Sequence, residues 1–335
     1  MPMKQCVESV TFPSASPLGW SGIVANSASG RGKGRDRVDR LVHAFHEERL
    51  ATRVAWTLES RTELVAAAES DPSCHGLVAV GGDGTVAGLI NEQPTVPMTV
   101  LPAGTENLFA RHFGLRPDPK LIARIVATGR TVPTDVGLAD GRRFSLMAGF
   151  GFDAEVVTRH HLARGSSGVL KPTHRAAYVE PVLRSSFTYP FPPLTIEILD
   201  HGQEETLIGT TAFLFNLPRY ALGLPFAPKA TAHDGWLDLI VFRTPGPFHA
   251  LRYLWLVLRG IHFQKPGIYY RRIRQARIST TADVPVQLDG DPGGVVADNH
   301  PWIIGILPEA VNVLVPEAYV ASLNAVRVAS TGAIG

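Results

Sequence analysis

The chain has 335 residues, of which 45% are hydrophobic, which is enough apolar material for about two packed domains. Its net charge of +2 gives no bulk attraction for nucleic acid, and two cysteines, Cys6 and Cys74, are too few for a disulfide scaffold or a zinc site. The first residues lack the apolar core of a signal peptide, and no apolar run reaches the ~18 residues of a membrane span. We therefore expect a cytoplasmic protein with no nucleic-acid partner.

The first part of the chain alternates strand-like and helical patterns. Short apolar runs at residues 22–25, 77–80 and 98–101 each lead into a turn rich in Gly, Ser or Thr. Apolar residues at helical spacing follow, notably in residues 35–48 and after Pro119. Such alternation predicts a parallel sheet covered by helices. The turns should then lie along one edge of the sheet, where open α/β sheets bind ligands.

The turn Gly81-Gly82-Asp83-Gly84-Thr85 is the most informative of these. Its glycines remove side chains where a polyphosphate could approach the backbone, and the following helix start favours an anion. Asp83 suits a hydrated Mg²⁺ carried by that phosphate. The alternative is a tight turn with Asp83 as a helix cap. The earlier loop adds Arg31, Lys33 and Arg35, which fit either a phosphate site or a solvated basic surface.

The pattern changes near residue 140, where strand-like runs begin to dominate. Gly, Pro and Asp turns separate many of them, which predicts an antiparallel sandwich or barrel-like domain. The boundary should lie within residues 131–140, and the tail after Pro316 is expected to form a short helix. The predicted strands are residues 194–199, 207–215, 237–242, 274–279, 284–288, 302–307 and 311–315.

An apolar helix is predicted within residues 248–263. Trp255 and several leucines dominate it, with Arg252 and Arg259 interspersed. Such a helix suits a lipid interface. The alternative is an ordinary core helix of the second domain, because the apolar residues nearly encircle it.

These segments, in this order, resemble the diacylglycerol kinase/lipid kinase catalytic family, which includes bacterial lipid kinases and sphingosine kinases. The family motifs N-P-x-S-G, G-G-D-G-T and P-L-G-T-G-N-D-F-A-R correspond to residues 26–30, 81–85 and 102–111. Later blocks also match over about residues 20–315, namely residues 135–137, 148–154, 216–223, 228–230, 234–238 and 287–291. The collinear set is far more specific than any one motif.

The resemblance implies a two-domain lipid kinase. Residues 18–138 would form an open parallel-sheet nucleotide-binding domain with helices on both faces, on which residues 316–330 pack. Residues 139–315 would form an antiparallel β-sandwich for the lipid, with a cleft between the domains. The activity implied is phosphoryl transfer from ATP with Mg²⁺ to a lipid hydroxyl, of a diacylglycerol or a sphingoid-type lipid. Peripheral membrane contact and a homodimer are further expectations.

The resemblance also implies roles for individual residues. Asp289 would be the general base and Asp291 would support the metal or orient Asp289, whereas the alternative for both is an acidic surface hairpin. Asp83 would organise Mg²⁺ through water. Asp234 and Asp238 suit a structural metal site or a strand-flanking turn equally. The nucleotide would be held by Asn26, Ser29, Gly30, Arg31, Lys33, Gly81, Gly82, Asp83, Gly84, Thr85, Gly104, Thr105 and Asn107.

Five positions depart from the family pattern and bear on nucleotide affinity and activity. Glu106 replaces a glycine and adds a negative charge near the expected nucleotide, unless it points away and favours the next helix. The others are Ser27 for proline, Gly88 for glutamate, Leu108 for aspartate and Asp291 for glutamate. Two alternatives remain open: an NAD-kinase-like enzyme, because G-G-D-G-T also marks that family, and a catalytically weak nucleotide- or lipid-binding regulator.

Overall fold

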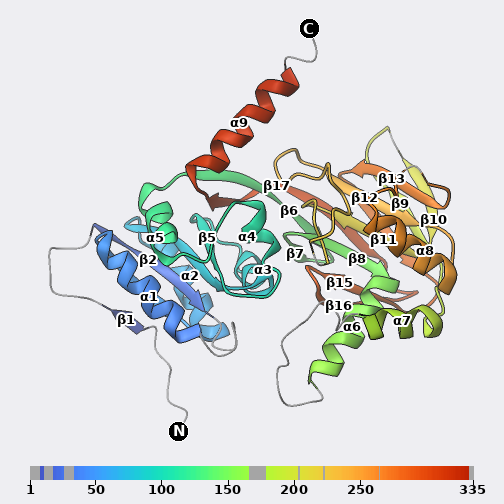
Figure 1. The fold of residues 1–335 in the computed structure, drawn as a ribbon, viewed down its shortest axis with the longest axis horizontal. Coiled ribbons are helices and arrows are strands. Elements are labelled where there is room, and N and C mark those ends of the chain that lie inside the picture. Colours follow the sequence, from blue (N-terminus) through green and yellow to red (C-terminus); the bar gives the residue numbers. More distant parts are fainter. Residues whose placement is uncertain are drawn as a thin grey trace. The chain divides into compact units, whose positions relative to one another are not determined.

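The computed structural model describes residues 8–10, 18–25, 34–165, 179–202, 204–221, 223–263 and 265–331. The chain forms two compact units, of which the first comprises Met1–Thr134 and Ala310–Gly335 and the second Asp135–Glu309. Figure 1 labels their helices and strands.

The first unit is built on a parallel sheet. Strands β2 (Gly19–Ala25), β3 (Leu50–Ala55), β4 (Cys74–Gly81) and β5 (Met98–Pro102) pair in parallel in the order β3-β2-β4-β5. Their residues are largely buried, as expected for strands covered on both faces. Strand β1 (Glu8–Val10) adds to β3 antiparallel, and Val313 of β17 (Trp302–Leu314) pairs with Met98 in parallel. The predicted parallel sheet is confirmed.

Six helices accompany this sheet in the described residues. Helix α1 buries Val38, Leu41 and Phe45, as their helical spacing predicts. Since the chain moves from β2 to β3 and then back past β2 to β4, right-handed crossovers place α1 and α2 on opposite faces. The helices are α1 (Gly34–Glu47), α2 (Leu58–Ser70), α3 (Asp83–Asn91), α4 (Leu108–His112), α5 (Pro119–Thr128) and α9 (Glu317–Thr331).

The second unit contains two antiparallel sheets. The first has the order β13-β12-β11-β8-β15-β16, and the second joins the first residues of β17 to β14, β9 and β10. Their facing side chains, such as Phe150 and Val286 with Ile196 and Ile304, form one buried core. The predicted β-sandwich is therefore confirmed. The strands are β8 (Met147–Gly151), β9 (Leu194–Ile198), β10 (Glu205–Gly209), β11 (Thr211–Phe215), β12 (Leu237–Phe242), β13 (Ile268–Ile273), β14 (Gln275–Thr280), β15 (Val284–Leu288) and β16 (Asp291–Val296).

Three of the predicted strands are divided or joined differently in the structure. The run 207–215 is divided at Thr210 into β10 and β11, which belong to different sheets. Gly209 lies at this corner, where a Cβ would come 2.3 Å from Cγ1 of Val241. The runs 302–307 and 311–315 are instead parts of one strand, β17, although Glu309 has a φ of 52°. Strands β6 (Thr131–Ala139) and β7 (Arg142–Phe144) form a hairpin over Gly137–Ala139.

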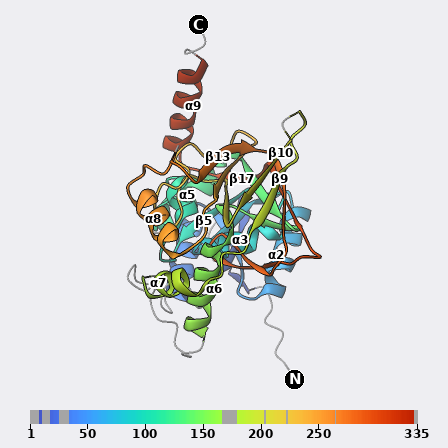
Figure 2. The ribbon, with the colours of Figure 1, turned by 90° about the vertical axis from the view of Figure 1, so that its right-hand side faces the viewer.

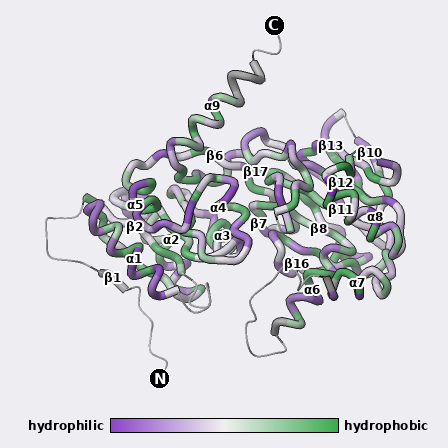
Figure 3. The backbone as a smooth tube through the Cα atoms, viewed as in Figure 1, coloured by the Kyte–Doolittle hydropathy of each residue, from purple (hydrophilic) through white to green (hydrophobic). Residues whose placement is uncertain are grey.

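Within its described residues, the second unit has three helices: α6 (Phe152–Gly165), α7 (Val179–Thr188) and α8 (Pro247–Leu258). Helices α7 and α8 are in contact, and Figure 2 shows them together on one side of the unit. Helix α8 is largely hydrophobic (Figure 3). In the described part of the chain, no helix combines the length and the hydropathy that crossing a membrane requires.

Candidate active site

The two glycine turns of the first unit lie against each other. Because β4 and β5 pair in parallel up to Gly81 and Pro102, their turns leave the same edge of the sheet. The Ala103 amide donates to the Gly81 carbonyl over 2.8 Å. A Cβ on Gly104 would lie only 2.6 Å from Cα of Gly82. This close approach requires glycine, so both turns depend on the residues that the motifs supply.

Asn107 fixes the second turn. It adopts the left-handed region with a φ of 50°, where asparagine is more easily accommodated than most residues. Its Oδ1 accepts the Gly104 amide over 2.8 Å, and its Nδ2 donates to the Gly104 carbonyl over 2.9 Å. Gly84, Gly104 and Thr105 remain exposed. The backbone of both turns is therefore rigidly held while its outer side stays open.

Asp83 links the two turns from the inside. Its Oδ2 accepts the Leu108 amide and its Oδ1 the Phe109 amide, each over 3.0 Å, so it caps the neighbouring helix α4 rather than α3, in which it lies. Burial raises the pKa of its carboxyl group, and the charge of Glu106 raises it further. Glu106 therefore lies close enough to act on this turn electrostatically. Leu108, at the position where the family has an aspartate, places its amide, not its side chain, at Asp83.

Helix α3 begins at Asp83 without any side-chain cap, because its N-cap residue is Gly82. The amides of a first helical turn that lack intrahelical partners attract anions. The feature that sequence reasoning missed here is Arg37, whose Nη1 donates to the Ala103 carbonyl over 2.9 Å. Its signal was the cluster of basic residues that begins at Arg31. Asn26, Ser29, Gly30, Arg31 and Lys33 lie outside the described residues.

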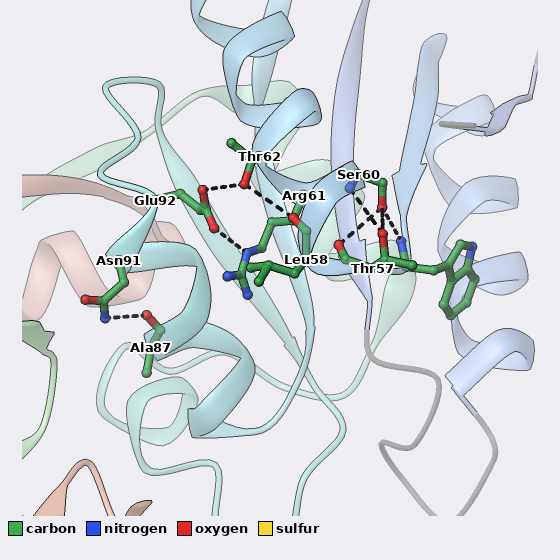
Figure 4. A network of polar contacts seen from close by, with 9 residues as sticks. Thr57, Leu58, Ser60, Arg61, Thr62, Ala87, Asn91 and Glu92 are labelled. Atoms are coloured by element: carbon green, nitrogen blue, oxygen red, sulfur yellow. Dashed lines mark hydrogen bonds and ion pairs between the residues drawn. The ribbon is translucent and has the colours of Figure 1, made fainter. Parts of the chain in front are cut away.

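Arg61 and Thr62 of α2 form a polar network with Glu92, the residue that follows α3 (Figure 4). Gly88 of α3 stands where the family motif has a glutamate. A Cβ on Gly88 would lie 2.5 Å from Nη1 of Arg61. Arg61 donates from Nε to Oε1 of Glu92 over 2.7 Å, and Thr62 donates to Oε2 of the same carboxylate over 3.0 Å. The Glu92 carboxylate thus belongs to a residue one helical turn after Gly88. The Arg61 guanidinium occupies the space that a Cβ at position 88 would need.

Asp289 lies in the second unit, in the turn between β15 and β16. Its Oδ2 accepts the amide and the hydroxyl of Ser145, over 2.7 and 2.9 Å. Its Oδ1 accepts the amides of Leu146 and Met147, over 2.7 and 3.1 Å. A carboxylate has about four acceptor sites, and all four are used here. Burial raises its pKa to about 6, although these four hydrogen bonds oppose that rise.

Asp153, which is half-buried, is a second carboxylate of the same unit, and sequence reasoning missed it. Gln287 donates from Nε2 to its Oδ2 over 3.0 Å, and the Tyr220 hydroxyl donates to the same oxygen over 3.2 Å. Burial raises its pKa to about 6. Oδ2 of Asp153 therefore accepts both of these side-chain hydrogen bonds. Its position within residues 148–154, a block that resembles the family, was the only sequence signal.

Asp153 lines an apolar pocket of the second unit. The pocket has a cavity volume of about 70 Å³ and is partly open to solvent. Six of the thirteen lining residues are aromatic, and Asp153 is the one carboxylate among them. The lining residues are Phe152, Asp153, Phe191, Thr210, Thr211, Phe213, Phe226, Phe242, Thr244, Ala250, Tyr253, Leu254 and Val257.

Asp234 lies just before strand β12, and Asp238 lies within that strand. Asp234 pairs with Nη2 of Arg272 and accepts the Trp236 amide over 3.1 Å. Asp238 accepts the Tyr270 hydroxyl. Across the residues described, no group of three or more His, Cys, Asp or Glu side chains is placed to hold a metal ion. Arg272, a cation, already partners Asp234, and the structural metal site suggested for Asp234 and Asp238 stays a prediction. Asp291 is exposed at the start of β16.

Family models match both units of the chain. The diacylglycerol kinase catalytic domain matches residues 21–139, and the YegS C-terminal NAD kinase beta sandwich-like domain matches residues 147–315. The chain belongs to the diacylglycerol kinase family of lipid kinases. Within this family, the diacylglycerol kinase of Bacillus subtilis is 27% identical over 287 residues, covering 82% of this chain and 90% of that protein. That of Mycobacterium tuberculosis (strain H37Rv) is 28% identical over 249 residues, covering 72% and 76%.

Solved structures show the same fold. A putative diacylglycerol kinase from Bacillus anthracis superposes with a TM-score of 0.71 at 19% identity, covering 91% of this chain and 98% of that chain. Yeast NADH kinase complexed with NADH superposes with a TM-score of 0.50 at 11% identity, covering 95% and 92%. The chain therefore resembles both structures in fold, the yeast NADH kinase less closely.

Proposed function

We propose that this diacylglycerol kinase family member transfers the γ-phosphoryl group of ATP, with Mg²⁺, to the hydroxyl of a diacylglycerol or a sphingoid-type lipid. The observation that carries the proposal is the apolar, aromatic pocket of the β-sandwich with Asp153 in its wall. Such a pocket suits hydrocarbon chains, and its one carboxylate suits a hydroxyl. The curated relatives named above are diacylglycerol kinases, which supports the same substrate class.

The nucleotide site of this proposal is the pair of glycine turns. The open backbone of Gly84, Gly104 and Thr105 and the uncapped start of α3 suit a polyphosphate, since both present amide groups without side chains in the way. Asn26, Ser29, Gly30, Arg31 and Lys33 are predicted to complete this site. Mg²⁺ would arrive with the phosphates and neutralise charge there, and Asp83 would contact it through water.

Two carboxylates are candidates for the general base. The resemblance assigns Asp289, but a hydroxyl could reach it only if Ser145 gave up a hydrogen bond. Asp153 lines the pocket, and both of its side-chain hydrogen bonds end on one oxygen. We therefore favour Asp153 as the group that accepts the hydroxyl proton while the oxygen attacks the γ-phosphorus and ADP leaves. Asp289 would hold the turn that positions Gln287, and Asp291 would act through that same turn.

The experiment that tests this function is transfer of labelled γ-phosphate from Mg-ATP to a panel of lipids in mixed micelles, with NAD as control acceptor. A labelled lipid is the expected result. Labelled NAD alone would replace the proposal by the NAD-kinase alternative. Confirmed nucleotide binding with no product on any acceptor would favour the regulator alternative. Cytoplasmic location, peripheral membrane contact and a homodimer remain predictions.

A further inference from the structure

Helices α7 and α8 expose large apolar side chains next to one another. The set comprises Leu183 and Phe187 of α7, Phe248, Trp255 and Leu258 of α8, and Ile261 just beyond α8, and it is called here the α7–α8 surface. Phe248 is 79% exposed, Phe187 63% and Trp255 52%. Single exposed apolar residues are ordinary, but here five lie on two helices in contact and a sixth lies just beyond α8, and such a concentration is typical of an interaction site.

Helix α8 separates this surface from the pocket. Ala250, Tyr253, Leu254 and Val257 lie on one face of the helix and line the pocket. At 100° per residue, Phe248, Arg252, Trp255 and Arg259 fall within a narrow arc on the opposite face. One face of this helix is thus packed, as the core alternative predicts, while the opposite face is exposed and the lipid-interface alternative stays a prediction.

The charge around α8 has one sign. Residues 240–282 contain no Asp or Glu and eight Arg or Lys. Within the described chain, Arg252, Arg259 and Lys265 have no carboxylate partner, whereas Arg184 of α7 lies 4.0 Å from Glu180. Arg259 lies over the Trp255 ring at 5.7 Å, which places a cation beside an exposed aromatic side chain. A tryptophan with flanking arginines suits the boundary between headgroups and acyl chains.

We propose that the α7–α8 surface docks on an anionic lipid bilayer, with Phe248 and Trp255 inserted and Arg252, Arg259 and Lys265 against the headgroups. This inference rests on the proposed function, since it states where the lipid comes from. The argument for a bilayer over a protein partner is the combination of unpaired cations with a pocket of apolar lining on the other side of the same helix. Anionic lipid satisfies the cations, and the bilayer supplies the acyl chains.

The test is cosedimentation of the full chain with vesicles of phosphatidylcholine alone or with added phosphatidylglycerol. The test variant is Phe248→Ser with Trp255→Ser. Its matched control is Leu58→Ser with Ile208→Ser, because those side chains are 61% and 60% exposed and lie outside the α7–α8 surface. We expect the wild type and the control to bind anionic vesicles and the test variant to bind at least about tenfold more weakly. Arg252→Gln with Arg259→Gln should remove the preference for anionic lipid.

Two results would overturn the docking proposal. One is equal vesicle binding by the test variant and the control. The other is a dimer of the wild type in solution that the test variant loses while vesicle binding persists, because a second copy would then be the occupant. Kinase activity is measured separately, on a short-chain lipid in detergent micelles, so that the proposed function is tested independently of docking. If that activity is present but vesicle binding is unchanged, docking fails and the function stands. Vesicle binding lost as expected, without activity on any lipid, leaves docking supported and overturns the function.

Discussion

Gln287 donates a hydrogen bond of 3.0 Å from Nε2 to Oδ2 of Asp153. The same side chain accepts the Gly290 amide on Oε1 over 2.8 Å and so holds the turn that contains Asp289. Gln287 thus connects the Asp153 carboxylate with the turn that contains Asp289. The carboxylate that lines the pocket and the one in the family motif therefore have different surroundings, and substitutions should separate their roles.

Asp153→Asn should lower kcat by about 100-fold or more, because the amide cannot take the hydroxyl proton. Nucleotide binding should be unchanged, since Asp153 lies in the other unit from the glycine turns. Steady-state kinetics and calorimetric ATP titration measure the two effects. Asp291→Asn is the control and should lose far less activity. Full activity of Asp153→Asn would remove this residue from the mechanism.

Asp289→Asn should instead lower stability, by about 2–4 kcal/mol. An asparagine offers one carbonyl oxygen to the four donors that Asp289 now accepts, so buried amides of residues 145–147 lose partners. Thermal and denaturant unfolding of wild type and variant measure this cost. A variant that unfolds like the wild type yet has lost transfer would restore Asp289 as the general base.

The pKa of Asp153 gives a pH dependence of stability with a defined sign. Its folded pKa of about 6 exceeds the ordinary aspartate value of 3.8, so the folded state favours the protonated form. The stabilisation that Asp153 gives the folded state is fully present below about pH 4 and is lost as the pH rises through 6. The free energy of unfolding should change by up to about 3 kcal/mol over this range. The measurement is the free energy of unfolding of Asp153→Asn and of the wild type at pH 4 and pH 8, because the difference between the two proteins isolates the effect of Asp153. The variant should be more stable relative to the wild type at pH 8 than at pH 4. The same difference at both pH values would contradict the shift.

Gly104→Ala should weaken nucleotide binding by pushing the two glycine turns apart. Its Cβ would meet the Gly82 backbone at 2.6 Å, and backbone atoms cannot move aside as a flexible side chain can. ATP titration should show a loss of about tenfold or more, with a cost in stability of about 1–3 kcal/mol. Gly305→Ala is the control, because the contact there is an ordinary 3.6 Å. Unchanged affinity would mean that the turns do not hold the nucleotide.

Glu106→Gln should strengthen ATP binding at low salt. Removing the charge lowers the repulsion on a polyphosphate and also lowers the pKa of Asp83, which Glu106 raises. A gain of a few-fold at low ionic strength should shrink at high salt, because exposed charges are screened. Titrations at two salt concentrations measure it. Weaker binding of the variant would indicate that Glu106 supports the turn instead of opposing the nucleotide.

The sequence predicted the elements better than the site. Continuous apolar runs such as residues 77–80 indicate buried parallel strands from the local sequence alone, and the glycine motifs indicate the turns that follow these strands. The surroundings of Asp289 could not be read, since its four donors come from Ser145, Leu146 and Met147, more than 140 residues away. The pocket at Asp153 likewise gathers residues from 152 to 257. Periodicity predicted helix α8, but only its neighbours decide which face is buried.

The most direct test of the central claim is a competition experiment. Dioctanoylglycerol, sphingosine and NAD are offered together to the wild type with Mg-ATP, and mass spectrometry identifies the phosphorylated product. The account predicts a phosphorylated lipid that requires both ATP and Mg²⁺ and is absent with Asp153→Asn. NADP as the sole phosphorylated product, formed equally well by Asp153→Asn, would contradict it.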